Sequence, residues 1–317
     1  MRGGSRGGGD RLVAMPAEEP TPSSAPIIRK NIDLQGAALA LLISVFWGIN
    51  PAFIKIALTD IAPLRLAGIR FVVGGTTIFL WAWWTGRLAG FRILPGEARP
   101  LLVVSTLLGI QVALMNYGTN ITSAAHSAVI LNSYAVHIVA LAHFLIPGDR
   151  LSGRRLTGIL IAYAGIVLLF ARRAPGGDAT LLGDLMIFAS SMLLAERTVY
   201  LARAVHHLDP VKLLLAQTAF GCFVFSIYAA LFETGPTRWT IELAAIVAFQ
   251  GVVLAGFNFV VNLWLLGRYR PSSLAAFFLT QPIFGVLAAT VMTHDALTLE
   301  LIVASAAVTV GIWLTSR

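Results

Sequence analysis

Charged side chains are scarce in this sequence. Asp, Glu, Lys and Arg make up only 12% of its 317 residues, whereas about a quarter of a soluble domain is charged. The mean hydropathy is correspondingly high, at +0.80. This shortage of charge excludes a soluble globular protein and predicts a polytopic membrane protein built as one domain.

Cysteine is almost absent as well. Cys222 is the single cysteine, so an internal disulfide framework is excluded, and in an apolar segment this thiol is expected to be a small packing residue. The histidines have no cysteine or carboxylate at metal-ligand spacing, and no HExxH, pair of deep carboxylates or nucleophile elbow occurs. We therefore expect no metal site, no cofactor and no enzymatic activity.

The first 33 residues have no apolar core. They are rich in Gly, Pro, Ser and charge, a composition that predicts disorder. They also lack a compact apolar run followed by a small-residue cleavage site, so no cleaved signal peptide is expected. Residues 1–33 are interpreted as a cytoplasmic tail.

What the chain has in abundance is long apolar runs. A membrane-spanning helix needs about 20 residues, with about 17 to 25 tolerated. Ten runs have roughly this length and predict ten transmembrane helices, at residues 36–58, 62–85, 99–117, 121–146, 155–172, 181–202, 211–232, 243–266, 272–293 and 297–315.

The two halves of the chain resemble each other. Residues 127–168 return 146 positions later as residues 273–314. The coinciding residues include the pairs Ser127 and Ser273, Asp149 and Asp295, Gly165 and Gly311, and, upstream, Asn116 and Asn262. Self-similarity at a period near half the chain implies two homologous halves, which we place at 34–172 and 173–317.

Basic residues are distributed unevenly among the predicted connections. With a cytoplasmic amino terminus, most Lys and Arg residues fall in inside segments, and the outside connections keep only Arg172, Arg173 and Arg238. This asymmetry satisfies the positive-inside rule with both termini in the cytoplasm. It also accounts for the net charge of +8 without nucleic acid, whose recognition needs a basic face on an exposed element.

Five spans in each half force the second half to insert upside down relative to the first, because five is an odd number. Inverted halves are the architecture of alternating-access carriers. The sequence therefore predicts an all-α membrane protein with ten transmembrane helices in two inverted five-helix repeats, acting as a carrier. The alternative is a small-solute channel or a lipid scramblase, although a channel needs a continuous polar lining and polar residues here gather near mid-membrane depth.

Short motifs accompany this span count. They are Trp47-Gly48-x-Asn50 in the first run, Pro63 followed by Arg70 in the second, and helix endings around Gly148-Asp149 and Asp295. Together with the repeat, they resemble the drug/metabolite transporter superfamily in its EamA-like branch, over residues 35–316. The resemblance implies a multi-pass inner-membrane (plasma-membrane) carrier for small metabolites, often an exporter of amino acids or related compounds.

Polar side chains near the middle of the predicted spans are the candidates for contact with cargo. A polar group in hydrocarbon is costly, so each should face a cavity, another polar group or the headgroups. Carriers of this architecture bind cargo at the midplane, whereas hydrogen bonding between helices is the alternative explanation for any one amide. At about 1.5 Å per residue, the candidates are Trp47, Asn50, Gln111, Asn132, Asn258 and Gln281.

Two of these amides precede a proline. Asn50 precedes Pro51, and Gln281 precedes Pro282. A proline inside a helix removes a backbone donor, frees a carbonyl about four residues earlier and kinks the helix. A freed carbonyl beside an amide suits the ammonium or carboxylate of a substrate, and a bend made only for packing is the alternative. Trp47 would add a flat apolar wall to the same pocket.

Ionisable residues within spans are the candidates for energy coupling. Glu196 is interpreted as the only carboxylate deep in a span, removed from water, and as a proton carrier or a substrate partner. The alternative is an acid neutralised by Arg203 or by a group on another helix. His137 is the second candidate, because histidine titrates near neutral pH, with a structural histidine as the preferred interpretation.

Charged residues near the predicted helix ends have simpler explanations. Asp149 and Asp295 are expected to be the N-caps of the fifth and tenth helices. Lys55 and Arg70 lie near the outer ends of the first two helices, where long basic side chains can reach the interface. Attraction of anions to the outer mouth is the functional alternative for these two cations.

Overall fold

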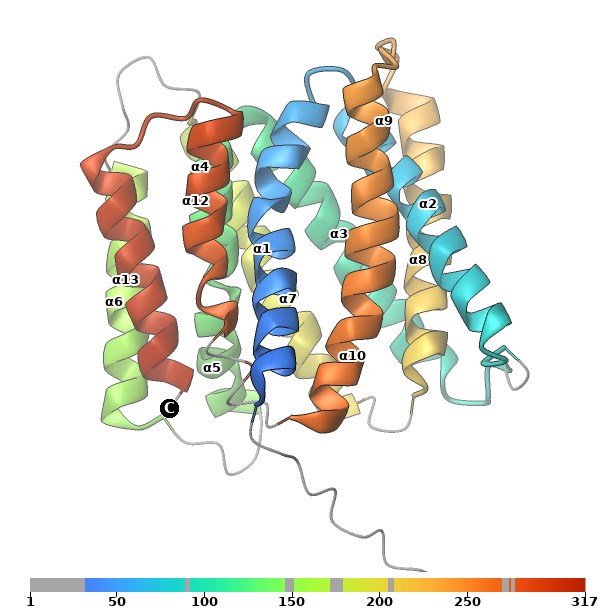
Figure 1. The fold of residues 1–317 in the computed structure, drawn as a ribbon, viewed down its shortest axis with the longest axis horizontal. Coiled ribbons are helices and arrows are strands. Elements are labelled where there is room, and N and C mark those ends of the chain that lie inside the picture. Colours follow the sequence, from blue (N-terminus) through green and yellow to red (C-terminus); the bar gives the residue numbers. More distant parts are fainter. Residues whose placement is uncertain are drawn as a thin grey trace, which may run out of the picture.

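The computed structural model describes residues 32–88, 92–145, 151–171, 179–204, 208–269, 274 and 277–316. The regular elements in these ranges are α1 (Leu34–Ala57), α2 (Pro63–Trp84), α3 (Ala98–Ile121), α4 (Ala124–Asn132), α5 (Tyr134–Leu145), α6 (Gly153–Ala171), α7 (Leu181–Ala204), α8 (Pro210–Phe232), α9 (Ile241–Ala248), η1 (Phe249–Phe257), α10 (Asn258–Arg268), α12 (Gln281–Met292) and α13 (Leu299–Ser316). Figure 1 shows a bundle of roughly upright helices, with the start of α1 and the end of α13 at the same end.

Within the described ranges, eight helices are long and apolar enough to cross a membrane. They match eight of the ten predicted runs to within a few residues. The sixth run is α7, a helix of 24 residues that carries Asp184, Glu196, Arg197 and Arg203. The ninth run is described in part, as α12. The helical membrane architecture is therefore confirmed, and the count of ten spans stays a prediction.

Helices begin where the sequence supplies a cap. The side chain of Asp33 accepts from the Gly36 N–H at 2.8 Å before α1, and Ser123 accepts from the His126 N–H at 3.1 Å before α4. Pro63 and Pro210 stand in the first turns of α2 and α8, where proline removes no intrahelical hydrogen bond. These local signals explain why the predicted helix starts are close to the observed ones.

Asp295 is not the N-cap of the last helix, so that prediction is wrong. Thr298 precedes α13, and its hydroxyl accepts from the Leu301 N–H at 3.2 Å. The Asp295 carboxylate instead accepts from the N–H of Ala125 at 2.7 Å, in the first turn of α4 and 170 residues earlier. The fold brings the start of α4 next to the loop that carries Asp295, so this carboxylate caps α4 instead of α13. Asp149 lies outside the described residues.

Two of the predicted spans are interrupted. The run at 121–146 divides into α4 and α5 at Ser133, whose N–H bonds to the Ile130 carbonyl three residues earlier instead of four. The run at 243–266 contains the π-helical segment η1 between α9 and α10. Neither interruption is visible in hydropathy, because the backbone hydrogen bonds change while the side chains stay apolar.

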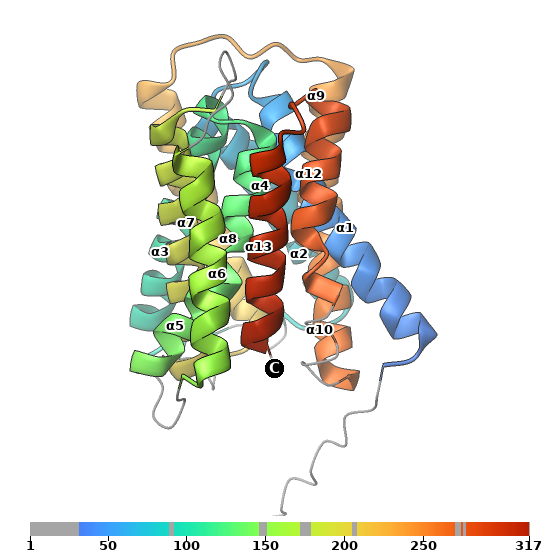
Figure 2. The ribbon, with the colours of Figure 1, turned by 90° about the vertical axis from the view of Figure 1, so that its left-hand side faces the viewer.

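Small residues allow the helices to approach closely. α6 and α13 pack against each other on one flank of the bundle (Figure 2). A Cβ added to Gly158 would lie 2.7 Å from the Gly311 carbonyl oxygen, and one added to Gly165 would lie 3.1 Å from the Ala304 carbonyl oxygen. The numbering of these contacts makes the two helices antiparallel, with backbones in contact as is typical of small-residue interfaces in membranes.

α1 is packed closely on two sides at mid-height. A Cβ on Gly48 would lie 2.7 Å from the Gln281 carbonyl oxygen, so α1 touches the start of α12. Gly285 of α12 in turn lies against Ala128 of α4. On its other side α1 contacts α9, η1 and α10. The residues predicted for cargo contact on α1 are therefore held between helices from the second half of the chain.

Candidate functional site

Asn50 is bonded to a residue that the sequence interpretation omitted. The Nε2 of Gln250, on η1, donates to the Asn50 Oδ1 at 3.1 Å. Both side chains are buried. Asn50 follows the stretch of α1 that packs on α12, so this amide pair joins η1 to the centre of the bundle. Gln250 is the one glutamine of its apolar run, which is the signal that would have found it.

Gln111 forms a closed pair with α7. Its Nε2 donates to the Ser190 hydroxyl at 3.0 Å, and that hydroxyl donates to the backbone carbonyl of Gln111 at 2.9 Å. Asn132 is satisfied within its own helix, because its Nδ2 donates to the Ala128 carbonyl at 2.8 Å. The structure therefore gives both amides protein partners and does not bring them to the Asn50–Gln250 pair.

Asn258 is the exception among the candidate amides. Its side chain begins α10 and is 1% exposed, yet neither its Oδ1 nor its Nδ2 has a hydrogen-bond partner among the described residues. The Oε1 of Gln250 also lacks a partner there. Buried polar groups are nearly always hydrogen-bonded, so each exception needs an explanation.

Trp47, Gln281 and the two prolines occupy different environments. Trp47 is 48% exposed, whereas Gln281, Pro51 and Pro282 are buried. Pro51 lies inside α1. Pro282 lies in the first turn of α12, where it removes no intrahelical hydrogen bond. The backbone of Gln281, at the same helix start, is the part that meets Gly48 of α1.

His137 is enclosed by hydroxyl groups. Its Nε2 lies 3.1 Å from the Ser191 Oγ and 3.3 Å from the Ser133 Oγ, and its Nδ1 lies 3.1 Å from the Tyr163 hydroxyl. The ring is 1% exposed and stacks on Tyr163 at 5.4 Å between centroids. Both nitrogens have partners on the described helices, an arrangement that suits a structural histidine.

Glu196 lies on the outer surface of α7 and not in the interior of the bundle. The buried acid of this helix is Asp184, at 0% exposure. Helix position fixes depth but not the direction in which a side chain points, so a coupling role for Glu196 stays a prediction. Arg197, the next residue, donates to the Gln217 side chain on α8 at 2.6 Å.

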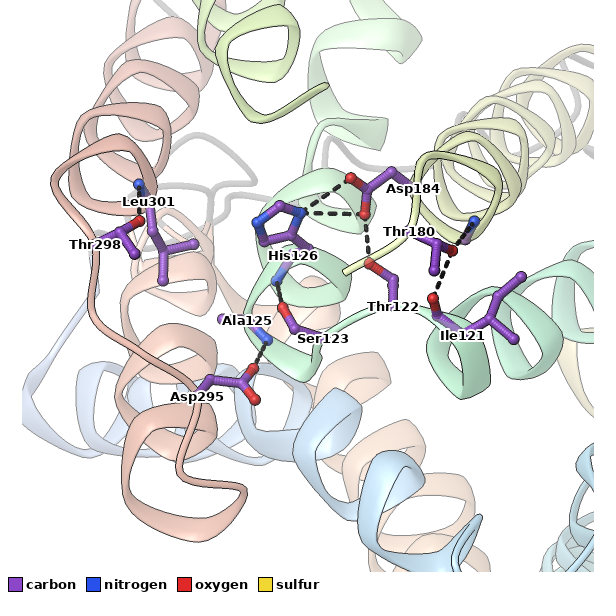
Figure 3. A network of polar contacts seen from close by, with 11 residues as sticks. Ile121, Thr122, Ser123, Ala125, His126, Thr180, Asp184, Asp295, Thr298 and Leu301 are labelled. Atoms are coloured by element: carbon purple, nitrogen blue, oxygen red, sulfur yellow. Dashed lines mark hydrogen bonds and ion pairs between the residues drawn. The ribbon is translucent and has the colours of Figure 1, made fainter. Parts of the chain in front are cut away.

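Asp184 is the centre of a junction at one end of the bundle (Figure 3). Its carboxylate accepts from the Thr122 hydroxyl at 2.5 Å and from the His126 Nδ1 at 3.0 Å. Asp295 lies at the same α4 N-terminus, on the Ala125 N–H. The Lys55 Nζ donates to the carbonyl of Thr122 at 2.7 Å. This junction joins α1, the α3–α4 turn, α7 and the loop before α13.

Two polar contacts lie near helix starts and ends at the opposite end of the bundle. The Asp33 carboxylate accepts from the Tyr269 hydroxyl at 2.7 Å, and the Gly36 N–H and this hydroxyl hold the pKa of Asp33 below its ordinary value. Glu97 accepts from Lys212 at 3.2 Å, and the Leu94 N–H and Lys212 lower the pKa of Glu97. Such contacts near the surface contribute little to stability.

A groove of about 400 Å³ opens between α12 and α13. No candidate residue lines it, and its walls are mostly apolar: Ile283, Val286, Ile302, Ser305, Ala306, Thr309 and Val310. A groove of this kind on a membrane helix pair suits lipid chains. Among the described residues, no group of three His, Cys, Asp or Glu side chains is placed to hold a metal ion.

The junction generates a stability prediction. Replacing a buried carboxylate that accepts two hydrogen bonds leaves His126 and Thr122 without their partner, so Asp184→Ala should lower the free energy of unfolding by about 1.5–3 kcal/mol. The melting temperature of the purified protein in detergent is the measurement. Glu242→Gln, at an exposed site on α9, is the matched control and should change little.

A double-mutant cycle isolates the pair itself. His126→Gln alone should destabilise, and its effect should largely vanish when Asp184 is already Ala, because both changes remove the same contact. Strictly additive losses would show that the junction does not hold the helices together.

Comparison with known proteins places this geometry in a family. The model of the EamA-like transporter family matches the chain twice, at residues 34–171 and at residues 181–317. A crystal structure of a protein with 18% sequence identity superimposes with a TM-score of 0.65, covering 89% of this chain and 97% of that one. That likeness concerns the fold.

Curated relatives are transporters. The uncharacterized transporter YoaV of Bacillus subtilis strain 168 is 19% identical over 275 residues, covering 86% of this chain and 93% of its own length. A probable amino-acid metabolite efflux pump of Escherichia coli strain K12 is 24% identical over 280 residues, covering 82% and 87%. The uncharacterized inner membrane transporter YedA of the same strain is 27% identical, covering 83% of each chain.

The two family matches extend over nearly the whole described chain, and the apolar helices place that chain in a membrane. The chain belongs to the EamA-like transporter family and is a multi-pass membrane transporter.

Proposed function

We propose that the chain is a secondary transporter of the plasma membrane that exports amino acids or related small metabolites by alternating access. In this proposal residues 34–172 and 173–317 are five-helix halves of opposite orientation, and both termini are cytoplasmic. The observation that carries the proposal is the double match of the family model. Two copies of a five-helix unit in one chain insert as an inverted pair, which is the architecture of many alternating-access carriers.

The packing of the helices supports two related halves. α1, the first helix of the first half, contacts α10 and α12 of the second. α7, the first helix of the second half, contacts α3, α4 and α5 of the first. The first helix of each half thus lies against the third and fourth helical segments of the other, and exchanging the halves converts one set of contacts into the other.

Single residues of the α6–α13 interface also exchange contacts when the two halves are exchanged. Gly165 coincides with Gly311 at an offset of 146 residues, and at that offset Gly158 coincides with Ala304. The contact of Gly165 with Ala304 therefore becomes the contact of Gly311 with Gly158, and both occur. This exchange favours a two-fold axis through the interface.

The candidate cargo contacts divide by their partners. Gln111 and Asn132 are hydrogen-bonded within the protein in this conformation, which favours the alternative of structural hydrogen bonding for them. Trp47 is half exposed, and Gln281 lies at the α1–α12 contact. Asn50 is hydrogen-bonded to Gln250, whose own Oε1 has no partner among the described residues. We propose that Trp47, Asn50 and Gln281, with Asn258, lie along the route of the cargo.

Transport by a carrier predicts counterflow. Vesicles loaded with an unlabelled L-amino acid mixture should accumulate a trace of labelled amino acid transiently above equilibrium, because each cargo molecule that leaves returns the binding site to the other side. Uptake should saturate with concentration. Equilibration of the labelled amino acid without an overshoot and without saturation would favour the channel. Movement of fluorescent lipid between the leaflets would favour the scramblase.

Energy coupling is a separate part of the proposal. Of the two candidates, Glu196 is better placed than His137, because its side chain lies at the surface of α7 without enclosing partners among the described residues, while both nitrogens of His137 are occupied. Glu196→Gln should keep counterflow and lose accumulation driven by a pH gradient. Glu242→Gln, which changes an exposed acid on α9, should keep both. Uphill transport by Glu196→Gln at the parent rate would show that this acid does not carry the proton.

A further inference from the structure

Four amide atoms on the helix formed by α9, η1 and α10 have no hydrogen-bond partner among the described residues. They are the Oε1 of Gln250, both the Oδ1 and the Nδ2 of Asn258, and the Oδ1 of Asn262, so Asn258 is the residue with both amide atoms open. The Gln250 and Asn258 side chains are 1% exposed, so bulk water does not satisfy them. An unmade hydrogen bond at a buried group costs free energy, and hydrocarbon around the bundle cannot supply the missing partner.

The backbone between these amides is also unusual. Gln250 and Asn258 stand at the two ends of the π-helical segment Phe249–Phe257, and π-helical turns within α-helices occur frequently at functional sites. Gly251 packs directly on Val73 of α2, where an added Cβ would lie 2.4 Å from a side-chain carbon. The segment is therefore held against α2 on one side while its amides lie elsewhere.

Two contacts fix where Asn258 lies along α1. The Gln250–Asn50 hydrogen bond marks one point, and the packing of Leu265 in a cluster with Ala40 and Ile43 marks another. Asn258 is about halfway between Gln250 and Leu265, which places it at the level of α1 near Ser44. The hydroxyl of Ser44 donates to the Ala40 carbonyl of its own helix at 2.8 Å.

The corresponding contact in the other half is complete. Ser190 lies 146 residues after Ser44, and it is the partner of the Gln111 amide across α3 and α7. At the α1–α10 interface the serine bonds to its own helix and the amide of Asn258 stays open. At the same offset Gln111 coincides with Phe257, so Asn258 stands one residue beyond the equivalent position. The open amide belongs to the interface that contains the π-helical segment.

We propose that Gln250 and Asn258 form the recognition site for the cargo, a proposal that rests on the carrier function above. Amide oxygens accept from an ammonium or N–H group, and the Asn258 Nδ2 donates to a carboxylate or carbonyl. None of the open atoms of Gln250 and Asn258 carries a formal charge. The site therefore takes a small solute with both a donor and an acceptor and no net charge, such as a zwitterionic amino acid, in preference to an anion or a cation.

Asn258→Leu separates this role from a structural one. An amide that bonds nothing in the empty protein loses nothing on replacement, so the melting temperature without ligand should stay the same or rise. Gln111→Leu, which removes the hydrogen bond from the Gln111 Nε2 to Ser190, should lower it. Thr309→Val, on α13 and bonded only within its helix, is the control for loss of a polar group in a span.

The binding measurement uses the twenty standard L-amino acids, with lactate and putrescine as anionic and cationic probes. A neutral amino acid should raise the melting temperature of the parent and of Thr309→Val. Asn258→Leu should need at least about tenfold more of it for the same shift, the loss of one well-made hydrogen bond.

Each other outcome has a definite meaning. Equal binding by Asn258→Leu and the parent would overturn the site and leave the amide to a buried water. A parent stabilised only by lactate or putrescine, or by no amino acid, would overturn the cargo class. Counterflow by the parent is measured separately, so these failures are distinguishable from failure of the carrier proposal.

Discussion

Polar groups inside this bundle have only the protein to bind, because lipid hydrocarbon offers no hydrogen bonds. Several of them find their partners on α7. Asp184 binds Thr122 and His126, Ser190 binds Gln111, and Ser191 lies against His137. One helix from the second half of the chain is thus tied to α3, α4 and α5 by its own polar side chains, and the rest of the bundle packs around that connection through small residues.

The same constraint makes the exceptions informative. α1 makes one side-chain hydrogen bond to the π-helical segment, between Asn50 and Gln250, and the amide of Asn258 below it has no partner. A carrier must release its cargo, so buried groups that are open in the empty state are suited to recognition, whereas bonded groups tie the helices together. This difference is the basis of our proposal that the α1–η1 interface recognises cargo while α7 joins the helices.

Much of the fold is predictable from the sequence because span length and apolarity are local properties. The predicted runs that correspond to α1, α2 and α8 begin and end within a few residues of the observed helices. Asp33, Pro63 and Pro210 mark the starts of these helices. The break at Ser133 and the π-helical segment are not predictable, since both change backbone hydrogen bonding without changing hydropathy.

The sequence identified several residues of the candidate site, but not the partners to which their side chains are hydrogen-bonded. Depth along a helix identified Asn50, Gln111 and Asn258, but the direction of a side chain depends on which helix lies opposite. For that reason depth alone did not distinguish Glu196, which lies at the surface of α7, from Asp184, which is buried near a helix end. Asp295 likewise caps α4 instead of α13, because the fold brings a distant helix start to its loop.

The inverted arrangement of the halves is the claim on which alternating access depends, and two equivalent positions test it directly. Gly153 starts α6, and Leu299, 146 residues later, starts α13. A side chain added at Gly153 meets nothing within 4 Å, and Leu299 is 72% exposed. In a Cys222→Ala background, an impermeant thiol reagent applied to intact cells should label Leu299→Cys, and should label Gly153→Cys only after permeabilisation. Labelling of both positions from the same side would contradict the inverted repeat.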